Sequence, residues 1–145
     1  MKNVANLLFP NLLFPNFFSP TFFSPTGHFG VAMMHGQLPQ NVREQSLRDF
    51  KAGKVTILVT TDIAARGLDV EKLPFVVNFD MPRSIEVYVH RIGRTGRQGN
   101  IGVAETLFSP TVDRKLTKQL MNVLQSCTQQ VPAELRALRE EDQRQ

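Results

Sequence analysis

The stretch VTILVT at residues 55–60, followed directly by TDIAARGLD at residues 61–69, decides the fold of this chain. The first part is almost continuously apolar and rich in β-branched residues, which is typical of a strand buried on both faces. The second part is polar and includes Gly67, so it predicts a connection at the end of that strand. In open parallel sheets, ligands bind at the carboxyl ends of strands. This rule directs attention to the segments that follow Thr60 and Phe79.

Further strands and helices alternate around this stretch. The alternation predicts an α/β fold, with an open parallel sheet and flanking helices. The predicted strands are residues 31–35, 55–60, 75–79 and 102–108. The predicted helices are residues 39–52, which Gly53 ends, residues 85–92, and a charged helix at residues 133–144. A further helix is predicted after a Ser109-Pro110 cap, with a buried face formed by Leu116, Leu120, Val123 and Leu124.

The amino-terminal segment differs from the rest of the sequence. Residues 6–26 contain a repeated five-residue unit that ends in proline. The unit reads NLLFP twice and then NFFSP and TFFSP. Proline removes a backbone donor, so a helix or a central strand is disfavoured there. We expect residues 1–30 to be irregular or disordered, residues 31–128 to form the folded domain, and residues 129–145 to form a charged C-terminal helix. The repeat is either a hydrophobic docking peptide or a duplicated, non-native tract.

Composition limits the classes of function. The chain has 145 residues, which suits one domain, and a net charge of +4, which permits an anionic partner. Its only cysteine, Cys127, excludes an internal disulfide and favours a reducing, intracellular compartment. The three histidines lack the spacing of metal ligands, so no metal site is predicted. No apolar run is long enough to span a membrane, so we expect no membrane partner.

Three clusters offer chemistry. The first, after the strand at residues 55–60, contains Thr61, Gly67 and Asp69, whose hydroxyl, close backbone approach and carboxylate could hold a nucleotide. An ordinary connection with a surface ion pair explains the same residues. The second is HRIGRTGRQG at residues 90–99, where glycines surround Arg94 and Arg97.

Guanidinium groups match phosphate in geometry and charge, and they stabilise the charge that develops during phosphoryl transfer. The alternative for the second cluster is a solvated basic loop after a helix, with His90 in a structural role. The third cluster is Gln40 and Arg43, three residues apart at the start of a helix, where the amino end attracts phosphate. An ordinary polar first turn is the alternative here.

Together these motifs resemble those of a known family. The order and spacing are similar to the C-terminal RecA-like domain of DEAD-box ATP-dependent RNA helicases. The resemblance covers about residues 31–126, and the long string at residues 88–97 makes it specific. The matching motifs are QxxR at 40–43, FKxG at 50–53, ILVTTDxAxRGLD at 57–69, NFDxP at 78–82 and YxHRIGRTGR at 88–97.

The resemblance implies roles for individual residues. It implies ATP as the nucleotide, with Mg²⁺, both held mainly by a second domain. It also implies RNA as the partner, gripped through its backbone and independently of sequence. The implied catalytic residues are the arginine fingers Arg94 and Arg97, with His90 linking to the other domain. The implied nucleotide contacts are Gly67, Asp69, Arg94 and Arg97, and the implied RNA contacts are Gln40, Arg43 and Thr61.

The sequence also departs from the family pattern. It contains no phosphate-loop motif and no Asp-Glu-Ala-Asp quartet, both of which belong to the family's amino-terminal RecA-like domain. The first strand and helix of the C-terminal domain are also missing, so we expect a truncated domain, incomplete at its N-terminal strand. Three hypotheses follow: a helicase fragment inactive alone in cytoplasm or nucleus, a non-catalytic RNA-binding or scaffold module, or a non-functional fragment that folds poorly.

Overall fold

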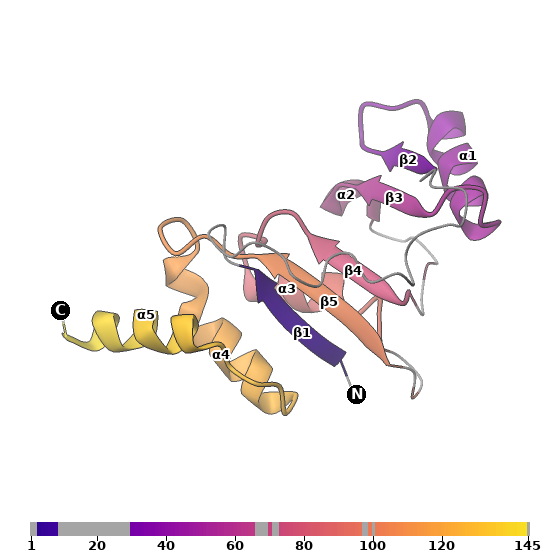
Figure 1. Ribbon diagram of the computed structural model, residues 1–145. Coiled ribbons are helices and arrows are strands. Elements are labelled where there is room, and N and C mark those ends of the chain that lie inside the picture. Colours follow the sequence, from indigo (N-terminus) through magenta and orange to yellow (C-terminus); the bar gives the residue numbers. More distant parts are fainter. Residues whose placement is uncertain are drawn as a thin grey trace. The chain divides into compact units, whose positions relative to one another are not determined.

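The computed structural model describes residues 3–8, 30–65, 70, 73–96, 99 and 101–144. They fall into two compact units (Figure 1), residues 14–70 and residues 1–13 with 71–145, and each is described by itself. Both units are built on parallel strands, as the alternating pattern predicted. Among the described residues, no helix combines the length and the apolar character needed to cross a membrane.

The unit of residues 14–70 holds a two-stranded parallel sheet. Strand β2 (Val31–Met34) pairs with β3 (Ile57–Thr60), and Met34 lies opposite Thr60 at the carboxyl ends. Helix α1 (Gln40–Lys51) follows β2, and the short α2 (Asp62–Ala65) follows β3. Gly53, at φ +71°, adopts the left-handed backbone that lets the chain leave α1, as predicted.

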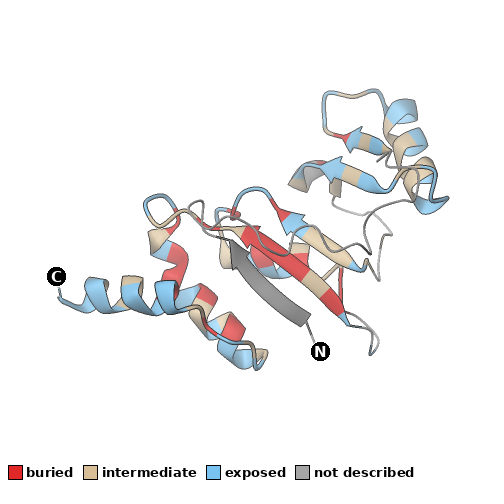
Figure 2. Ribbon diagram, viewed as in Figure 1, coloured by how far each residue is buried: buried red, intermediate tan, exposed pale blue. Residues whose placement is uncertain are grey.

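The other unit holds a three-stranded parallel sheet in the order β1-β5-β4. Its helices contribute most of a core that also includes Phe108 after β5 (Figure 2), and Tyr88, Phe108, Leu120, Leu124 and Leu135 are its largest buried apolar side chains. The predicted apolar faces of α3 and α4 are therefore confirmed, except that Val89 is 42% exposed. The elements are β1 (Asn3–Leu8), β4 (Phe75–Asn78), α3 (Ile85–Ile92), β5 (Gly102–Leu107), the 3₁₀ turn η2 (Arg114–Leu116), α4 (Thr117–Ser126) and α5 (Ala133–Arg144).

Strand β1 corrects one expectation. Residues 1–30 were predicted to be irregular, but residues 3–8 pair in parallel with β5, from Asn3 opposite Gly102 to Leu8 opposite Leu107. The strand ends before Pro10, so every residue in it keeps its backbone donor, and it lies at the edge of the sheet. The remainder of the repeat, residues 9–29, lies outside the described residues.

Two further expectations differ in detail. One open sheet was predicted, whereas the described strands form two, and no ladder joins β3 to β4 among them. Helix α4 begins later than the Ser109-Pro110 cap predicted. The Asp113 carboxylate accepts the Ser109 backbone N–H at 2.7 Å and closes a turn, so α4 starts only at Thr117.

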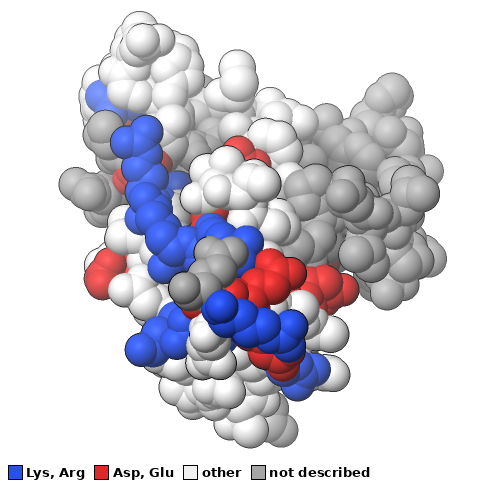
Figure 3. All heavy atoms as spheres, turned by 90° about the vertical axis from the view of Figure 1, so that its left-hand side faces the viewer, with Lys and Arg blue, Asp and Glu red and all other residues white. Residues whose placement is uncertain are grey.

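The charged helix α5 is held by ion pairs as well as by Leu135. The Arg114 guanidinium donates to the carboxylates of Asp142 at 2.7 Å and Glu141 at 3.0 Å, and these contacts raise the pKa of Arg114. Basic and acidic side chains lie next to one another on the face shown in Figure 3. That face is therefore of mixed sign rather than a continuous basic surface.

Tyr88 provides a test of the core. It is 1% exposed, and burial, followed by the nearby Cys127, raises its pKa to about 12 from the ordinary 10.0. Between these pH values the folded chain keeps a proton that the unfolded chain loses, so stability should fall as pH rises through this window. The chain has one tyrosine and no tryptophan, so tyrosinate absorbance reports this side chain alone.

We expect tyrosinate to form only near pH 12 or together with unfolding followed by circular dichroism. Replacing Tyr88 with Phe should remove this contribution to the pH dependence of stability. Ionisation near pH 10 with the folded structure intact would contradict the placement of Tyr88 in the core.

Candidate functional site

The amino end of α1 and the segment after β3 leave the same edge of the two-stranded sheet. Parallel pairing puts the ends of β2 and β3 side by side, and residues 35–39 connect β2 to α1. Among the described residues, no side chain caps the amino end of α1, and the first turn of this helix contains no acidic residue. Backbone donors and a positive dipole end are therefore presented there, which is the arrangement that attracts anions.

Arg43 lies one turn into α1 and is half-buried. Its Nε is buried and has no hydrogen-bond partner, and no carboxylate pairs with it, within the part of the chain that the structure describes. Arg48, further along the same helix, differs. Its guanidinium lies 3.8 Å from the Glu44 carboxylate and donates to Gln45 at 2.9 Å. Arg43 therefore keeps its charge available for an external anion.

Thr61 is exposed directly after β3. Its backbone N–H donates to the Met34 carbonyl at 3.3 Å, and its own carbonyl accepts the Ala65 N–H at 2.8 Å. These bonds fix the backbone of Thr61 between the sheet and α2. The structure thus brings the predicted RNA contacts Gln40, Arg43 and Thr61 to one edge of one unit.

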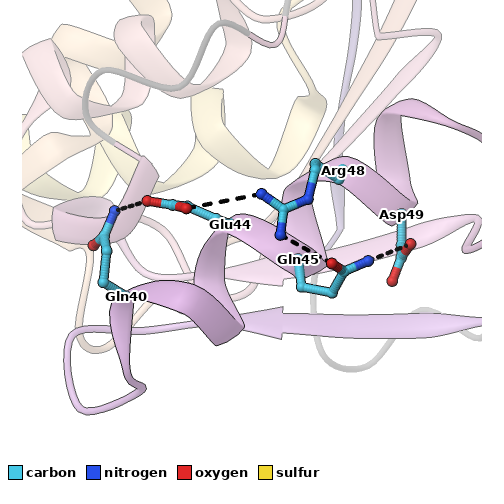
Figure 4. A network of polar contacts seen from close by, with 5 residues as sticks. All are labelled: Gln40, Glu44, Gln45, Arg48 and Asp49. Carbon is cyan, nitrogen blue, oxygen red and sulfur yellow. Dashed lines mark hydrogen bonds and ion pairs between the residues drawn. The ribbon is translucent and has the colours of Figure 1, made fainter.

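A chain of polar contacts runs along the surface of α1 (Figure 4). We call Gln40, Glu44, Gln45, Arg48 and Asp49 the α1 network. Gln40 donates to Glu44 at 2.8 Å, and Gln45 donates to Asp49 at 2.9 Å. The hydrogen bond from Gln45, and then Lys54 beside it, lowers the pKa of Asp49. The sequence did not indicate this network.

Helix α3 carries the second cluster and ends in a fixed turn. Ser84 caps its amino end by accepting the Val87 N–H, and His90 is exposed on its last turn. The carbonyl of Arg94, just beyond the helix, accepts the Leu73 N–H at 3.0 Å. Thr95, 1% exposed, forms a bridge to Leu73 and donates from its hydroxyl to the Leu73 carbonyl. The backbone that carries Arg94 is therefore clamped to the segment before β4.

The clamp also shows at which strand ends the turn of Arg94 lies. The rule for parallel sheets directed attention to the carboxyl ends after Thr60 and Phe79, whereas Leu73 precedes β4 and Gly102 begins β5. The turn of Arg94 accordingly lies at the amino ends of these strands. The physical reason is that α3 runs back along the sheet after the connection that follows β4.

Sequence reasoning missed a buried network beneath α3. Asn78, 1% exposed at the end of β4, donates to the Thr106 hydroxyl at 2.9 Å. Arg91 donates from Nη1 to the Asn78 side-chain oxygen at 3.4 Å and to the Asp80 carbonyl at 3.1 Å. A polar residue at the end of the apolar run FVVN was the available signal, because buried polar groups need partners.

Several predicted site residues cannot be placed. Gly67, Asp69 and Arg97 lie outside the described residues, so the expected meeting of Asp69 with the two arginines stays a prediction. Among the described residues, no three His, Cys, Asp or Glu side chains group in a way that could hold a metal ion.

Comparison with known proteins identifies the class. The model of the helicase conserved C-terminal domain family matches residues 16–99. Vasa of Drosophila melanogaster, an ATP-dependent RNA helicase, is 47% identical over 108 residues, which are 74% of this chain and 16% of vasa. The ATP-dependent RNA helicase DDX4 of Mus musculus is 51% identical over 100 residues, 69% of this chain and 14% of that relative. The chain spans less than a fifth of the length of these relatives.

Solved structures agree with the sequence comparison. The yeast DEAD-box splicing factor Prp28 is 35% identical with a TM-score of 0.69, over 74% of this chain and 25% of that chain. Prp28 from Chaetomium thermophilum, solved bound to ADP, is 44% identical with a TM-score of 0.66, over 74% of this chain and 27% of that one. This chain belongs to the helicase conserved C-terminal domain family and carries the C-terminal RecA-like domain of a DEAD-box RNA helicase.

Gly102 tests the clamp under Arg94. A Cβ added there would overlap the Thr95 hydroxyl and stand 2.5 Å from the Gly96 backbone nitrogen. Gly102→Ala should therefore force the turn of Arg94 away from β5 and lower the unfolding free energy by about 1–3 kcal/mol, the usual cost of overpacking. Denaturant unfolding measures this. Gly36→Ala is the control, since nothing lies within 4 Å of a Cβ there. Equal stability of the two variants would show that the turn is not packed against β5.

Proposed function

We propose that this chain acts as the C-terminal domain of an ATP-dependent RNA helicase, in which Arg94 and Arg97 act as arginine fingers. His90 would link to the partner domain, Gly67 would approach the nucleotide through its backbone, and Asp69 would contact the ATP ribose. The observation that carries this proposal is the clamp of Leu73 and Thr95 on the Arg94 turn. A guanidinium on a fixed backbone is preorganised for charge that develops on a phosphoryl group, which is how arginine fingers act.

The residues of this chain fit one part of a site for ATP and Mg²⁺. This chain offers cationic groups for phosphate, whereas its sequence has no phosphate-loop lysine motif. The proposed partner is therefore an amino-terminal RecA-like domain, which would hold the triphosphate and its metal ion. The chain's own residues would meet the nucleotide from the other side.

This division predicts the ATPase behaviour. The chain alone should release no phosphate from ATP above a protein-free blank, with or without single-stranded RNA, because its sequence has no phosphate-loop motif. Adding the separately expressed amino-terminal RecA-like domain of a DEAD-box relative should give RNA-dependent phosphate release.

Arg94→Gln or Arg97→Gln should then reduce that rate by about 10³-fold or more. Arg83→Gln, a change at an exposed arginine outside the motif, is the control and should leave the rate unchanged. RNA-stimulated turnover by the chain alone would refute the need for a partner domain.

The RNA-binding part of the proposal rests on a separate observation. Gln40, Arg43 and Thr61 lie in one compact unit, and Arg43 has no ion-pair partner among the described residues. Backbone amides, a hydroxyl and a guanidinium are groups that contact phosphates and sugars rather than base edges, so binding would be independent of sequence. The same observation favours the second candidate, a non-catalytic RNA-binding module, because this part needs no nucleotide.

Two arginines on α1 provide a matched test of RNA binding. Arg43→Gln should weaken binding of single-stranded RNA and reduce the slope of log K against log salt by about 0.7, the value for one phosphate contact on a single strand. Arg48→Gln removes the same charge from the same helix, but Arg48 is already engaged by Glu44 and Gln45. The slope of log K against log salt for Arg48→Gln should therefore stay near that of the unmodified chain. Equal slopes for the two variants in filter binding would contradict the role of Arg43.

A further inference from the structure

The edge of β5 that faces β1 is a binding site for an extended strand. Strand β5 pairs with β4 only from Val103 to Thr106, whereas it pairs with β1 along its whole length, from Gly102 to Leu107. Four of the six residues of β5 are buried. Buried backbone donors and acceptors need hydrogen-bond partners. This edge therefore requires a strand, and among the described residues β1 supplies it.

A long connection joins β1 to the rest of its sheet. After Leu8 the chain runs through residues 14–70, which form the other compact unit, and it reaches the next strand of this sheet only at Phe75. Closing a long connection costs more entropy than closing a short turn. The connection therefore favours pairing with the chain's own β1 less than a short turn would.

The sequence of β1 contains nothing that restricts the strand to one chain. Residues 3–8 read NVANLL, with no charged residue, no glycine and no proline, and they lie at the edge of the sheet. Proteins commonly use charge or proline to keep edge strands from pairing with other chains. Each copy of the chain carries the same strand and the same β5 edge, so exchange of β1 preserves every backbone hydrogen bond of the ladder.

We propose that two copies of this chain exchange β1, so that each β1 pairs in parallel with β5 of the other copy. The register is that of the single chain, from Asn3 opposite Gly102 to Leu8 opposite Leu107. The partner is thus a second copy, which contributes a strand to the sheet of the first. No residue proposed for ATP or RNA lies in β1 or β5, so the exchange is independent of the proposed function.

Cysteine pairs test the exchange in the full chain with Cys127→Ser. Val4 and Val103 are Cα partners in the ladder, and paired strands lie about 5 Å apart, a separation that a disulfide spans. Val4→Cys chains mixed with Val103→Cys chains in a glutathione redox buffer should give a disulfide-linked heterodimer on a non-reducing gel. While monomer predominates, a tenfold rise in chain concentration should raise the heterodimer fraction about tenfold.

Two further samples complete the test. Val112→Cys is the control for random collisions, because Val112 is 72% exposed and lies outside both strands. Its mixture with Val4→Cys should give far less heterodimer than the mixture with Val103→Cys. A chain that carries both Val4→Cys and Val103→Cys should link within itself when dilute and between copies when concentrated.

The other outcomes overturn the exchange. Equal yields with Val103→Cys and Val112→Cys would show random collision, and Val4→Cys homodimers alone would show pairing of the outer edges of β1. A double variant that links only within itself at every concentration would show that β1 stays on its own sheet, and the absence of any link would show that the ladder does not form.

Light scattering of the unmodified chain provides a measurement without substitutions. A dimer whose fraction rises with concentration is expected, and a monomer at every concentration contradicts the exchange. Circular dichroism confirms that each cysteine variant is folded. If one is not, Ala5→Cys with Ala104→Cys, the next pair of the ladder, replaces it.

Discussion

A helix that follows a strand of a parallel sheet runs back along that sheet, and this constraint places every candidate functional group described above. In the unit of residues 14–70, strands β2 and β3 end together, so the start of α1 and Thr61 meet at their carboxyl edge. In the other unit, α3 returns along β4 and delivers Arg94 to the amino edge, beside Leu73 and Gly102. Arg94, proposed for ATP, is therefore held at the amino ends of its strands, whereas the start of α1 and Thr61, proposed for RNA, lie at the carboxyl ends of theirs.

The direction of α3 also explains the buried network beneath it. Side chains on a helix lean toward its amino end, so Arg91 reaches back from the last turn toward the carboxyl end of β4. There it meets Asn78 and the Asp80 carbonyl. Arg91 thus holds the end of α3 within the domain. Spacing in the sequence does not indicate this contact, because Arg91 belongs to one basic string with Arg94.

Local patterns predicted the elements well where the signals are local. Gly53 ends α1, Pro132 precedes α5, and the apolar spacing around Tyr88 and Ile92 locates the buried face of α3. Prediction was poorer where pairing between distant segments decides the outcome. The edge strand β1, the two separate sheets and the late start of α4 depend on partners that a window of sequence does not contain. The same is true of the clamp between Leu73 and Thr95.

For the candidate site, motif spacing names the candidate residues but does not show which groups of each side chain are already bonded. Arg43 and Arg48 have the same charge and lie on the same helix, yet only Arg48 has an acidic partner among the described residues. Gln40 and Gln45 have the same amide, yet Glu44 directs the oxygen of the first outward, whereas Arg48 and Asp49 engage both ends of the second. Because a carboxylate accepts and a guanidinium donates, the neighbours of each side chain decide which of its groups remain for an external ligand.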